Sequence, residues 1–356
     1  MIRKLLKSAA ILLAAVVALA AVALAVFTVA EYRPKDVEAV SPIGTAAGEL
    51  HAGDTVRVLT WNLGYGALGD NADFFMDGGT MVQTADEARV RRNMADIREF
   101  VTSDAPDLLF LQETDLNSDR SHHIDERAEL AAAMPGYTSL FAYNYNALYV
   151  PYPLPPIGHV ESGLLTFSRY FVSEGSRIQL PCPFSWPVRM VNLKRCLLVS
   201  RIPVEGSDKE LVAVNLHLEA YDDGSGKIAQ SVMLASFLKS ELDKGNYVIV
   251  GGDFNQVFSN ADLDRWTVKE GLWAPGVIYA EESDERLSLL MDGTVPTCRS
   301  LDRVLAGADR ADFQYYLIDG FMVSDNLRVE RLETVDLGFT ATDHNPVRLA
   351  VTLLNE

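Results

Sequence analysis

Cysteine and basic residues are both scarce in this 356-residue sequence. Its three cysteines include no Cys-x-x-Cys pair, which excludes a disulfide-rich scaffold and a zinc-ribbon site. Lys and Arg number 31 against 49 Asp and Glu, for a formal net charge of −18. This deficit argues against a broad basic face for nucleic acid, although a small local one is compatible with it. Hydrophobic residues make up 48% of the chain, which excludes wholesale disorder.

Residues 1–30 form a basic and then strongly apolar segment. Arg3, Lys4 and Lys7 precede the run from Ala9 to Ala30, in which Thr28 is the only polar residue. As a helix this run would be about 33 Å long, enough to cross a bilayer core of about 30 Å. Basic residues before the run and acidic residues after it predict one transmembrane helix, with the N-terminus inside and the remaining chain extracytoplasmic.

A cleaved signal peptide is the alternative interpretation, and it would make the protein a secreted one. Thr28-Val29-Ala30 is an acceptable cleavage sequence. However, cleavable signals usually have apolar regions of about 7–15 residues, which favours the uncleaved anchor. Either way, the chain beyond residue 30 keeps 28 basic against 49 acidic residues, a net charge of −21.

The rest of the chain is predicted to consist of a tether, residues 31–54, and one domain, residues 55–356. The tether is inferred from Pro34, Pro42 and Gly44 among small and charged residues. Helical spacing predicts a helix over 86–101 and another over 227–242, the second with Ile228 and Val232 on its apolar face. Strands are predicted at 56–60, 107–111, 162–167, 196–200, 211–218, 247–251, 316–323 and 347–353. This alternation indicates an α/β fold with mixed sheets.

Two segments rich in proline and aromatic residues, 143–159 and 181–190, are predicted to be surface loops. They would either contact substrate or simply pack onto the domain. Cys182 and Cys196 flank the second loop. Outside the membrane they would form a disulfide closing that loop or remain free thiols, and neither alternative gives a cysteine a catalytic role.

Polar side chains of chemical interest lie at the ends of the apolar runs. They are Asn62, Gln112, Glu113, Asn215, His217, Asp253, Asn255, Asp319, Asp343 and His344. Strand ends in a layered α/β protein converge on one edge, so we expect these side chains to lie together. Carboxylate and amide oxygens suit Mg²⁺, Mn²⁺ or Ca²⁺, and histidines beside carboxylates suit proton transfer. Each residue alone has an ordinary structural explanation, but together they predict metal-assisted hydrolysis of a phosphate ester.

The chain resembles the endonuclease/exonuclease/phosphatase superfamily, which includes deoxyribonucleases, AP-site endonucleases, neutral sphingomyelinases and inositol polyphosphate 5-phosphatases. The resemblance spans about residues 55–356. Its motifs, in the family's order, are TWN (60–62), LQE (111–113), ESGLLTFSR (161–169), NLHLEA (215–220), GGDFN (251–255), IDGF (318–321) and TDHNPV (342–347). It implies a four-layer sandwich, with two packed mixed β-sheets flanked by helices.

The resemblance also implies a cation site and a water-binding site. Glu113 would be the principal ligand of Mg²⁺, or of Mn²⁺ or Ca²⁺, with Asn62 and Asp343 in support. Asp253 and Asn255 would orient the attacking water. Asn62 and Asn255 would also contact the substrate phosphate.

A pair of histidines completes the implied site. His344 would contact the phosphate, and Asp319 would hold it cationic. His217 would be the second histidine, as in the deoxyribonuclease and sphingomyelinase branches. Glu161 would be its carboxylate partner or, alternatively, a solvated loop acid.

Three functions fit this pattern. The first is a membrane-anchored phosphodiesterase that acts on a phospholipid head group. The second is an extracytoplasmic nuclease, for which Arg89, Arg91 and Arg92 would form a small basic surface or merely a solvated helix face. The third is a catalytically silent binding module, which the complete set of motif residues argues against. The implied partners are a phosphodiester, whether phospholipid or nucleic acid, and the membrane.

Overall fold

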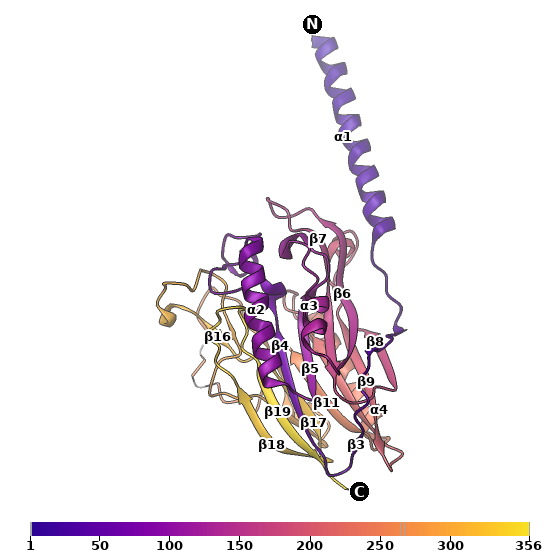
Figure 1. The fold of residues 1–356 in the computed structure, drawn as a ribbon. Helices are drawn as coiled ribbons and strands as arrows, with labels where there is room; N and C mark the ends of the chain where they lie inside the picture. The colour runs from indigo at the N-terminus through magenta and orange to yellow at the C-terminus, as the bar shows by residue number, and fades with distance from the viewer. Residues whose placement is uncertain (1, 264, 267, 356) are drawn as a thin grey trace.

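Two mixed β-sheets pack face to face in the computed structural model, which describes residues 2–263, 265–266 and 268–355 (Figure 1). The first sheet has the order β18-β19-β4-β5-β7-β6-β2. Its strands are β18 (Leu327–Thr334), β19 (Val347–Leu353), β4 (Thr55–Asn62), β5 (Leu108–Asp115), β7 (Gly158–Ser168), β6 (Thr138–Val150) and β2 (Ile43–Gly44).

The second sheet has the order β1-β8-β9-β10-β11-β17-β14, and β3 pairs with β9 beside it. Its strands are β1 (Val37–Ala39), β8 (Glu174–Gln179), β9 (Cys196–Glu205), β10 (Glu210–His217), β11 (Tyr247–Asp253), β17 (Asp319–Ser324), β14 (Leu287–Leu290) and β3 (Leu50–His51). Two short ladders lie apart from the sheets: β12 (Gln256–Phe258) with β13 (Gly276–Ile278), and β15 (Cys298–Arg299) with β16 (Tyr315–Tyr316).

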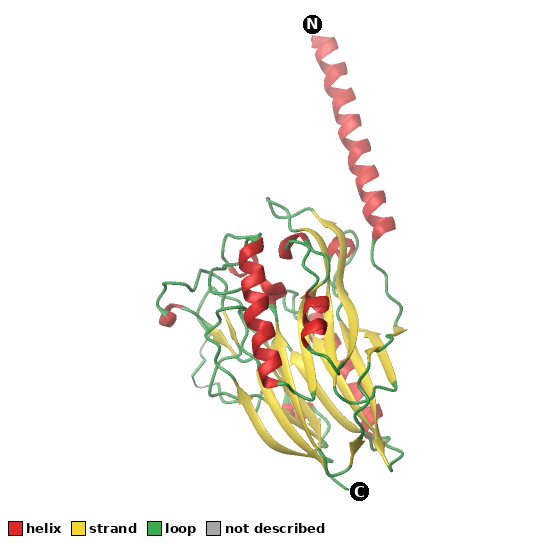
Figure 2. Cartoon of the chain, viewed as in Figure 1, coloured by secondary structure: helices red, strands yellow, loops and turns green. Residues whose placement is uncertain are grey.

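Helices cover the outer faces of both sheets, which gives four layers (Figure 2). On the first sheet, α2 (Glu87–Asp104) buries Val90, Met94 and Ile97, and α3 (Glu126–Ala133) lies beside it. On the second sheet, α4 (Ser225–Leu242) buries Leu234 and Leu238. The 3₁₀ turns are η1 (Gly64–Gly66), η2 (Phe75–Asp77), η3 (Asp119–Ser121), η4 (Val188–Val191), η5 (Ala280–Glu282) and η6 (Arg310–Asp312).

A largely aliphatic core that includes two phenylalanine rings fills the space between the sheets. Phe110 of β5 and Phe321 of β17 are fully buried there. Gly251 of β11 makes room for both rings, because a Cβ at this position would lie 2.6 Å from Phe321 Cε1 and 2.9 Å from Phe110 Cδ2. The glycine in this strand therefore serves close ring packing, although glycine usually weakens a strand.

The N-terminal helix α1 (Ile2–Ala30) extends away from the body, and the structure buries none of its residues (Figure 1). It is long and apolar enough to cross a membrane, and a signal sequence near the N-terminus would look the same.

The prediction that residues 31–54 form an unpacked tether is wrong. Within residues 31–54, β1 pairs with β8, β2 with β6 and β3 with β9, and Leu50 is buried in the core. Short edge strands need only backbone hydrogen bonds, so a composition rich in proline and glycine does not reveal them. The folded body therefore begins well before residue 55.

Two other local predictions also need correction. The face assigned to the helix over 227–242 is partly wrong, because Ile228 and Val232 are exposed while Leu234 is buried. Most of the predicted loop 143–159 belongs to β6 and β7, although the 181–190 segment is a loop that leads into η4. Cys182, Cys196 and Cys298 are all free thiols. Of the two alternatives for Cys182 and Cys196, the structure therefore has the free thiols and not the disulfide.

Truncating a phenylalanine of the core between the sheets should cost much of the folding stability. Phe110→Ala removes a ring buried between the sheets and is expected to lower the free energy of unfolding by about 3–5 kcal/mol. Urea denaturation of the full-length protein in detergent measures this loss. Phe171→Ala is the matched control, because that ring is 55% exposed and should change stability by about 0.5 kcal/mol or less. Equal effects from the two variants would contradict the assigned core.

Candidate active site

The polar strand ends identified in the sequence converge at one edge of the sandwich. Parallel pairing aligns Asn62 at the end of β4 with Gln112 in β5. In the other sheet, parallel pairing of β10 with β11 places His217 opposite Asp253, and β17 adds Asp319 opposite Asp253. The register within each sheet thus aligns these side chains, and the packing of the two sheets brings Asn62 to Asp253, 191 positions away.

Asp253 connects the two sheets at this edge. Its Oδ2 accepts a hydrogen bond from Asn62 Nδ2 at 3.0 Å and lies 3.4 Å from His217 Nε2 and 3.8 Å from His344 Nε2. Its Oδ1 accepts the backbone N–H of Asn255 at 2.9 Å. With only 2% of Asp253 exposed, four neighbouring groups fix the position of one buried carboxylate.

Two site residues adopt backbone conformations that are unfavourable for side chains other than glycine. Glu113 has φ of 52° and Asn255 has φ of 49°. Glu113 lies in a bulge of β5, where the register with β7 shifts between Leu111 and Thr114. The bulge brings Glu113 Oε1 to 3.3 Å from Asn62 Nδ2. Such strain concentrates at functional sites, where the surrounding fold compensates for it.

The two histidines have opposite electrostatic environments. Burial alone would lower the pKa of His344, but Asp319 Oδ2, 2.8 Å from Nδ1, holds that pKa well above its ordinary value. Burial lowers the pKa of His217 far below its ordinary value, and the positive charges of Arg195 and His344 add to this. Near neutral pH the site therefore holds an imidazolium at 344 and a neutral imidazole at 217, a division typical of acid–base sites.

Hard oxygen donors make the edge suitable for a divalent cation. Burial raises the pKa values of the Glu113, Asp343 and Asp253 carboxyls, a cost that a bound cation would offset. Asp343 Oδ1 faces the backbone of Gly64, where a Cβ would lie only 2.9 Å away. Ligand atoms of Asp253, Asp319 and His344 lie within 4.8 Å of one another. The donor set fits Mg²⁺ better than a soft metal.

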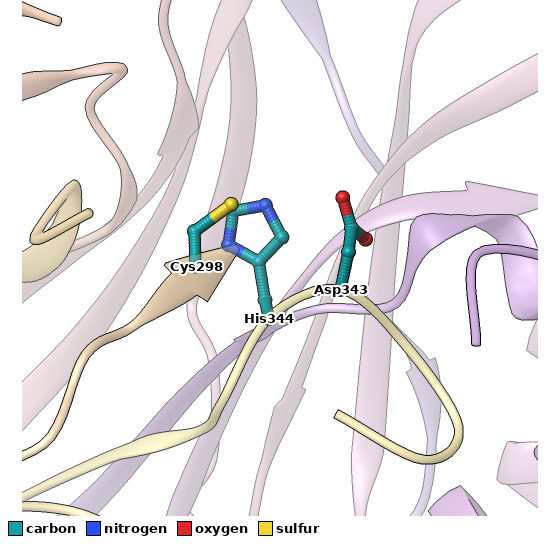
Figure 3. Close-up of side chains that lie close together, drawn as sticks. All are labelled: Cys298, Asp343 and His344. Atoms are coloured by element: carbon teal, nitrogen blue, oxygen red, sulfur yellow. The ribbon is translucent and has the colours of Figure 1, made fainter. Parts of the chain in front are cut away.

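Cys298 is a neighbour of this site that the sequence motifs do not identify. Its Sγ lies beside the His344 ring, and the three side chains Cys298, Asp343 and His344 form a second close group (Figure 3). Burial raises the pKa of the thiol to about 12. It therefore remains protonated near neutral pH and is a poor ligand for a hard cation.

Glu161 does not pair with His217. Its Oε1 lies 3.2 Å from His159 Nε2, and its backbone N–H donates to Ser118 Oγ. Residues 159 and 161 are two apart on β7 and therefore share one face of the strand, which explains this pairing. Among the described residues, His217 Nδ1 has no hydrogen-bond partner.

Two arginines lie beside the site that the sequence patterns did not identify. Arg120 binds Asp115 through two hydrogen bonds of 3.1 and 2.9 Å, and its guanidinium lies 3.7 Å from the centre of the Tyr65 ring. Burial raises the pKa of Glu113, and the charge of Arg120 partly opposes that shift. The second arginine, Arg195, comes directly before β9. Neither follows an apolar run, so the strand-end pattern could not reveal them.

Comparison with known proteins identifies the family and the fold. The model of the endonuclease/exonuclease/phosphatase family matches residues 59–344, whereas no curated protein matches the chain. An endonuclease/exonuclease/phosphatase structure from Beutenbergia cavernae superimposes with a TM-score of 0.54 at 20% identity, covering 85% of this chain and 72% of that one. The human nocturnin catalytic domain gives 0.53 at 16% identity, covering 88% of this chain and 97% of its own. At these identities the structural likeness concerns the fold.

Removing the charge of Asp319 should lower the pKa of His344. In Asp319→Asn the carboxylate that stabilises the imidazolium is gone while burial remains, so the pKa should fall. NMR titration of the His344 ring protons in the variant and the wild type measures this change directly. An unchanged His344 titration would contradict the assigned ion pair.

Proposed function

The chain belongs to the endonuclease/exonuclease/phosphatase family, and we propose that it is a Mg²⁺-dependent phosphodiesterase anchored in a membrane and acting on a phospholipid head group. Members of this family are metal-dependent phosphoesterases. The observation that carries the proposal is the buried Asp253 carboxylate between a neutral and a cationic histidine, beside hard oxygen donors.

Glu113, Asn62 and Asp343 are the residues proposed to hold the cation. When bound, Mg²⁺ would supply positive charge that polarises the phosphate and makes a water molecule more acidic. Asn62 Nδ2 donates to both Glu113 and Asp253, so it links the cation site to the carboxylate that orients the attacking water. Asn62 would also contact the phosphate.

Asp253 and the histidines are proposed to manage the protons. Burial and the neighbouring Asp319 raise the pKa of Asp253, which improves this carboxylate as acceptor of the attacking water's proton. The Asp319–His344 pair leaves Nε2 of His344 to donate to the phosphate, stabilise the transition state's negative charge and protonate the leaving oxygen. His217 Nε2 lies on the other side of Asp253, and Asn255 would hold a phosphate oxygen.

The position of the site relative to α1 favours a substrate in the membrane. Strand β19 ends at the end of the body far from α1 (Figure 1). Because β4 runs antiparallel to β19, Asn62 at the end of β4 lies on the side of α1. Tyr152 and Leu154, in the connection between β6 and β7 on that side, are 72% and 87% exposed. Exposed aromatic and apolar side chains suit a lipid interface.

The nuclease alternative finds less support in the basic cluster on α2. Arg89 binds Asp70 at 2.6 Å, and Arg91 binds Glu87 at 2.7 Å. These pairs offset two of the charges that would meet a nucleic-acid backbone, within a body of net charge −21. We therefore place the lipid substrate first and the extracytoplasmic nuclease second.

Removing the proposed cation ligand or the cationic histidine should nearly abolish hydrolysis. Glu113→Ala and His344→Ala are each expected to lower kcat by about 10²–10³-fold, as losing one transition-state stabiliser typically does. Hydrolysis of bis(p-nitrophenyl) phosphate with Mg²⁺ measures this, and EDTA should stop the reaction. The control is Glu330→Gln on β18, at the edge of the first sheet. Near-wild-type turnover in either alanine variant would refute the site assignment.

A substrate panel separates the candidate functions. We expect the full-length protein to hydrolyse sphingomyelin or phosphatidylcholine in vesicles with Mg²⁺ and to leave plasmid DNA and RNA intact, because an uncleaved anchor together with the exposed apolar loop would hold the site near a bilayer. DNA nicking without lipid cleavage would establish the nuclease instead. If no substrate in the panel is hydrolysed, the result would support the catalytically silent binding module. Mass measurement of the membrane-extracted protein tests the anchor, which a mature N-terminus at Glu31 would exclude.

A further inference from the structure

Two loops of the body leave large apolar side chains uncovered beside the end of α1. In the connection between β8 and β9, Trp186 is 50% exposed and Val188 is 54% exposed. At the end of β6 and in the connection that follows it, Leu148, Tyr152 and Leu154 are exposed as well. Monomeric soluble proteins rarely gather such side chains in one place, so a surface of this kind indicates a partner.

The two loops rest on one support and form one surface. The η4 turn packs against β6, where Tyr145 Oη donates to the Val191 carbonyl at 3.2 Å. Tyr145, Val191 and Ile157 of the β6–β7 connection belong to the same small apolar cluster. We call the exposed part of the two loops, residues 148–154 and 186–188, the apolar rim.

A hydrogen bond fixes the depth of this rim relative to the apolar helix. Trp186 Nε1 donates to Thr28 Oγ1 at 3.1 Å, and the same oxygen lies 3.2 Å from Met190 Sδ. Thr28 is two residues before Ala30, where α1 ends. If α1 spans a bilayer, Thr28 lies where the acyl chains meet the head groups. Trp186 then lies at the same level, which is where tryptophan is enriched in membrane proteins.

The charges around the end of α1 suit phosphate head groups. The buried Glu31 carboxylate has three cationic neighbours, namely Arg33 at 3.0 Å, Arg189 at 3.1 Å and Lys194 at 3.7 Å. One negative charge does not balance three, so this group carries excess positive charge within a body of net charge −21. The side chains of Arg33 and Arg189 are exposed, and basic side chains at this level attract lipid phosphates.

We propose that the apolar rim enters the interface of the bilayer that α1 spans, so that the body rests on the membrane in addition to being anchored in it. This inference rests on the proposed function, because it requires an uncleaved α1. Lipid is the occupant, and not a second protein chain, because the hydroxyl that Trp186 binds belongs to the membrane-spanning segment itself. Contact through both loops restricts the tilt of the body and keeps the edge that carries Asn62 turned towards the lipid.

Fluorescence quenching by brominated phosphatidylcholine tests this contact without turnover, because bromine quenches only indoles that reach the acyl chains. The chain has four tryptophans, so variants assign the signal. In vesicles that contain the full-length protein, the wild type should be quenched, and Trp186→Phe should lose most of that quenching. The matched control is Trp266→Phe, whose indole donates to the Gly293 carbonyl at 3.0 Å, and it should keep the wild-type quenching. Equal quenching of Trp186→Phe and the wild type would overturn the proposal.

Val188→Glu provides a second test that keeps all four tryptophans. A carboxylate at this depth is costly to bury in lipid, so the loop should withdraw and the brominated lipid should quench less than in the wild type. Unchanged quenching would overturn the proposal. So would a Trp186 that neither brominated lipid nor aqueous acrylamide quenches, because a protein surface would then cover it.

The same vesicles separate this inference from the proposed function. If Trp186 contacts lipid but no phosphodiester is hydrolysed, the proposed function fails while this inference stands. If phosphodiesters are hydrolysed but Trp186 does not contact lipid, the reverse holds.

Discussion

The rest of the site is arranged around the carboxylate of Asp253. It belongs to β11 in one sheet and accepts a hydrogen bond from Asn62 of β4 in the other. Both histidines approach the same oxygen. Because this carboxylate is buried, every neighbouring charge acts on it through a medium that screens weakly. The protonation of the site therefore depends on how the two sheets pack.

Buried charge around this centre is largely arranged in opposed pairs. Asp319 faces His344, and Asp115 faces Arg120, each at hydrogen-bond distance. Each partner makes the other's burial tolerable, whereas either one alone would be expensive. The site's own carboxylates, Glu113 and Asp343, lack such close cationic partners among the described residues. Burial raises their pKa values even though nearby cations oppose the shift, and a divalent cation is the natural counter-charge.

The sequence was sufficient to predict that polar side chains at strand ends gather at one edge of the sandwich. Asn62, His217 and Asp253 each end an apolar run, and parallel pairing then brings strand ends together for a general geometric reason. The β-sandwich with its outer helices was likewise predicted from motif order. These features depend on patterns that extend over several residues, and such patterns can be recognised in the sequence alone.

What could not be predicted depends on which way a single side chain points or on backbone pairing alone. Glu161 turns to His159 because both lie on one face of β7. The strands within residues 31–54 form through backbone bonds that leave no apolar pattern. Arg195 acquires its neighbours only when β9 is placed beside β10. The last two of these facts have no local signature in the sequence.

The loop between β8 and β9 contacts the end of α1 and leads to Arg195. Near its middle, Trp186 Nε1 donates to Thr28 Oγ1 of α1, and Arg189 and Lys194 hold the Glu31 carboxylate. Its last residue before β9 is Arg195. Ten residues, from 186 to 195, thus join the contacts with the apolar helix to the guanidinium of Arg195. The segment that contacts the end of α1 is consequently the same one that carries this buried positive charge.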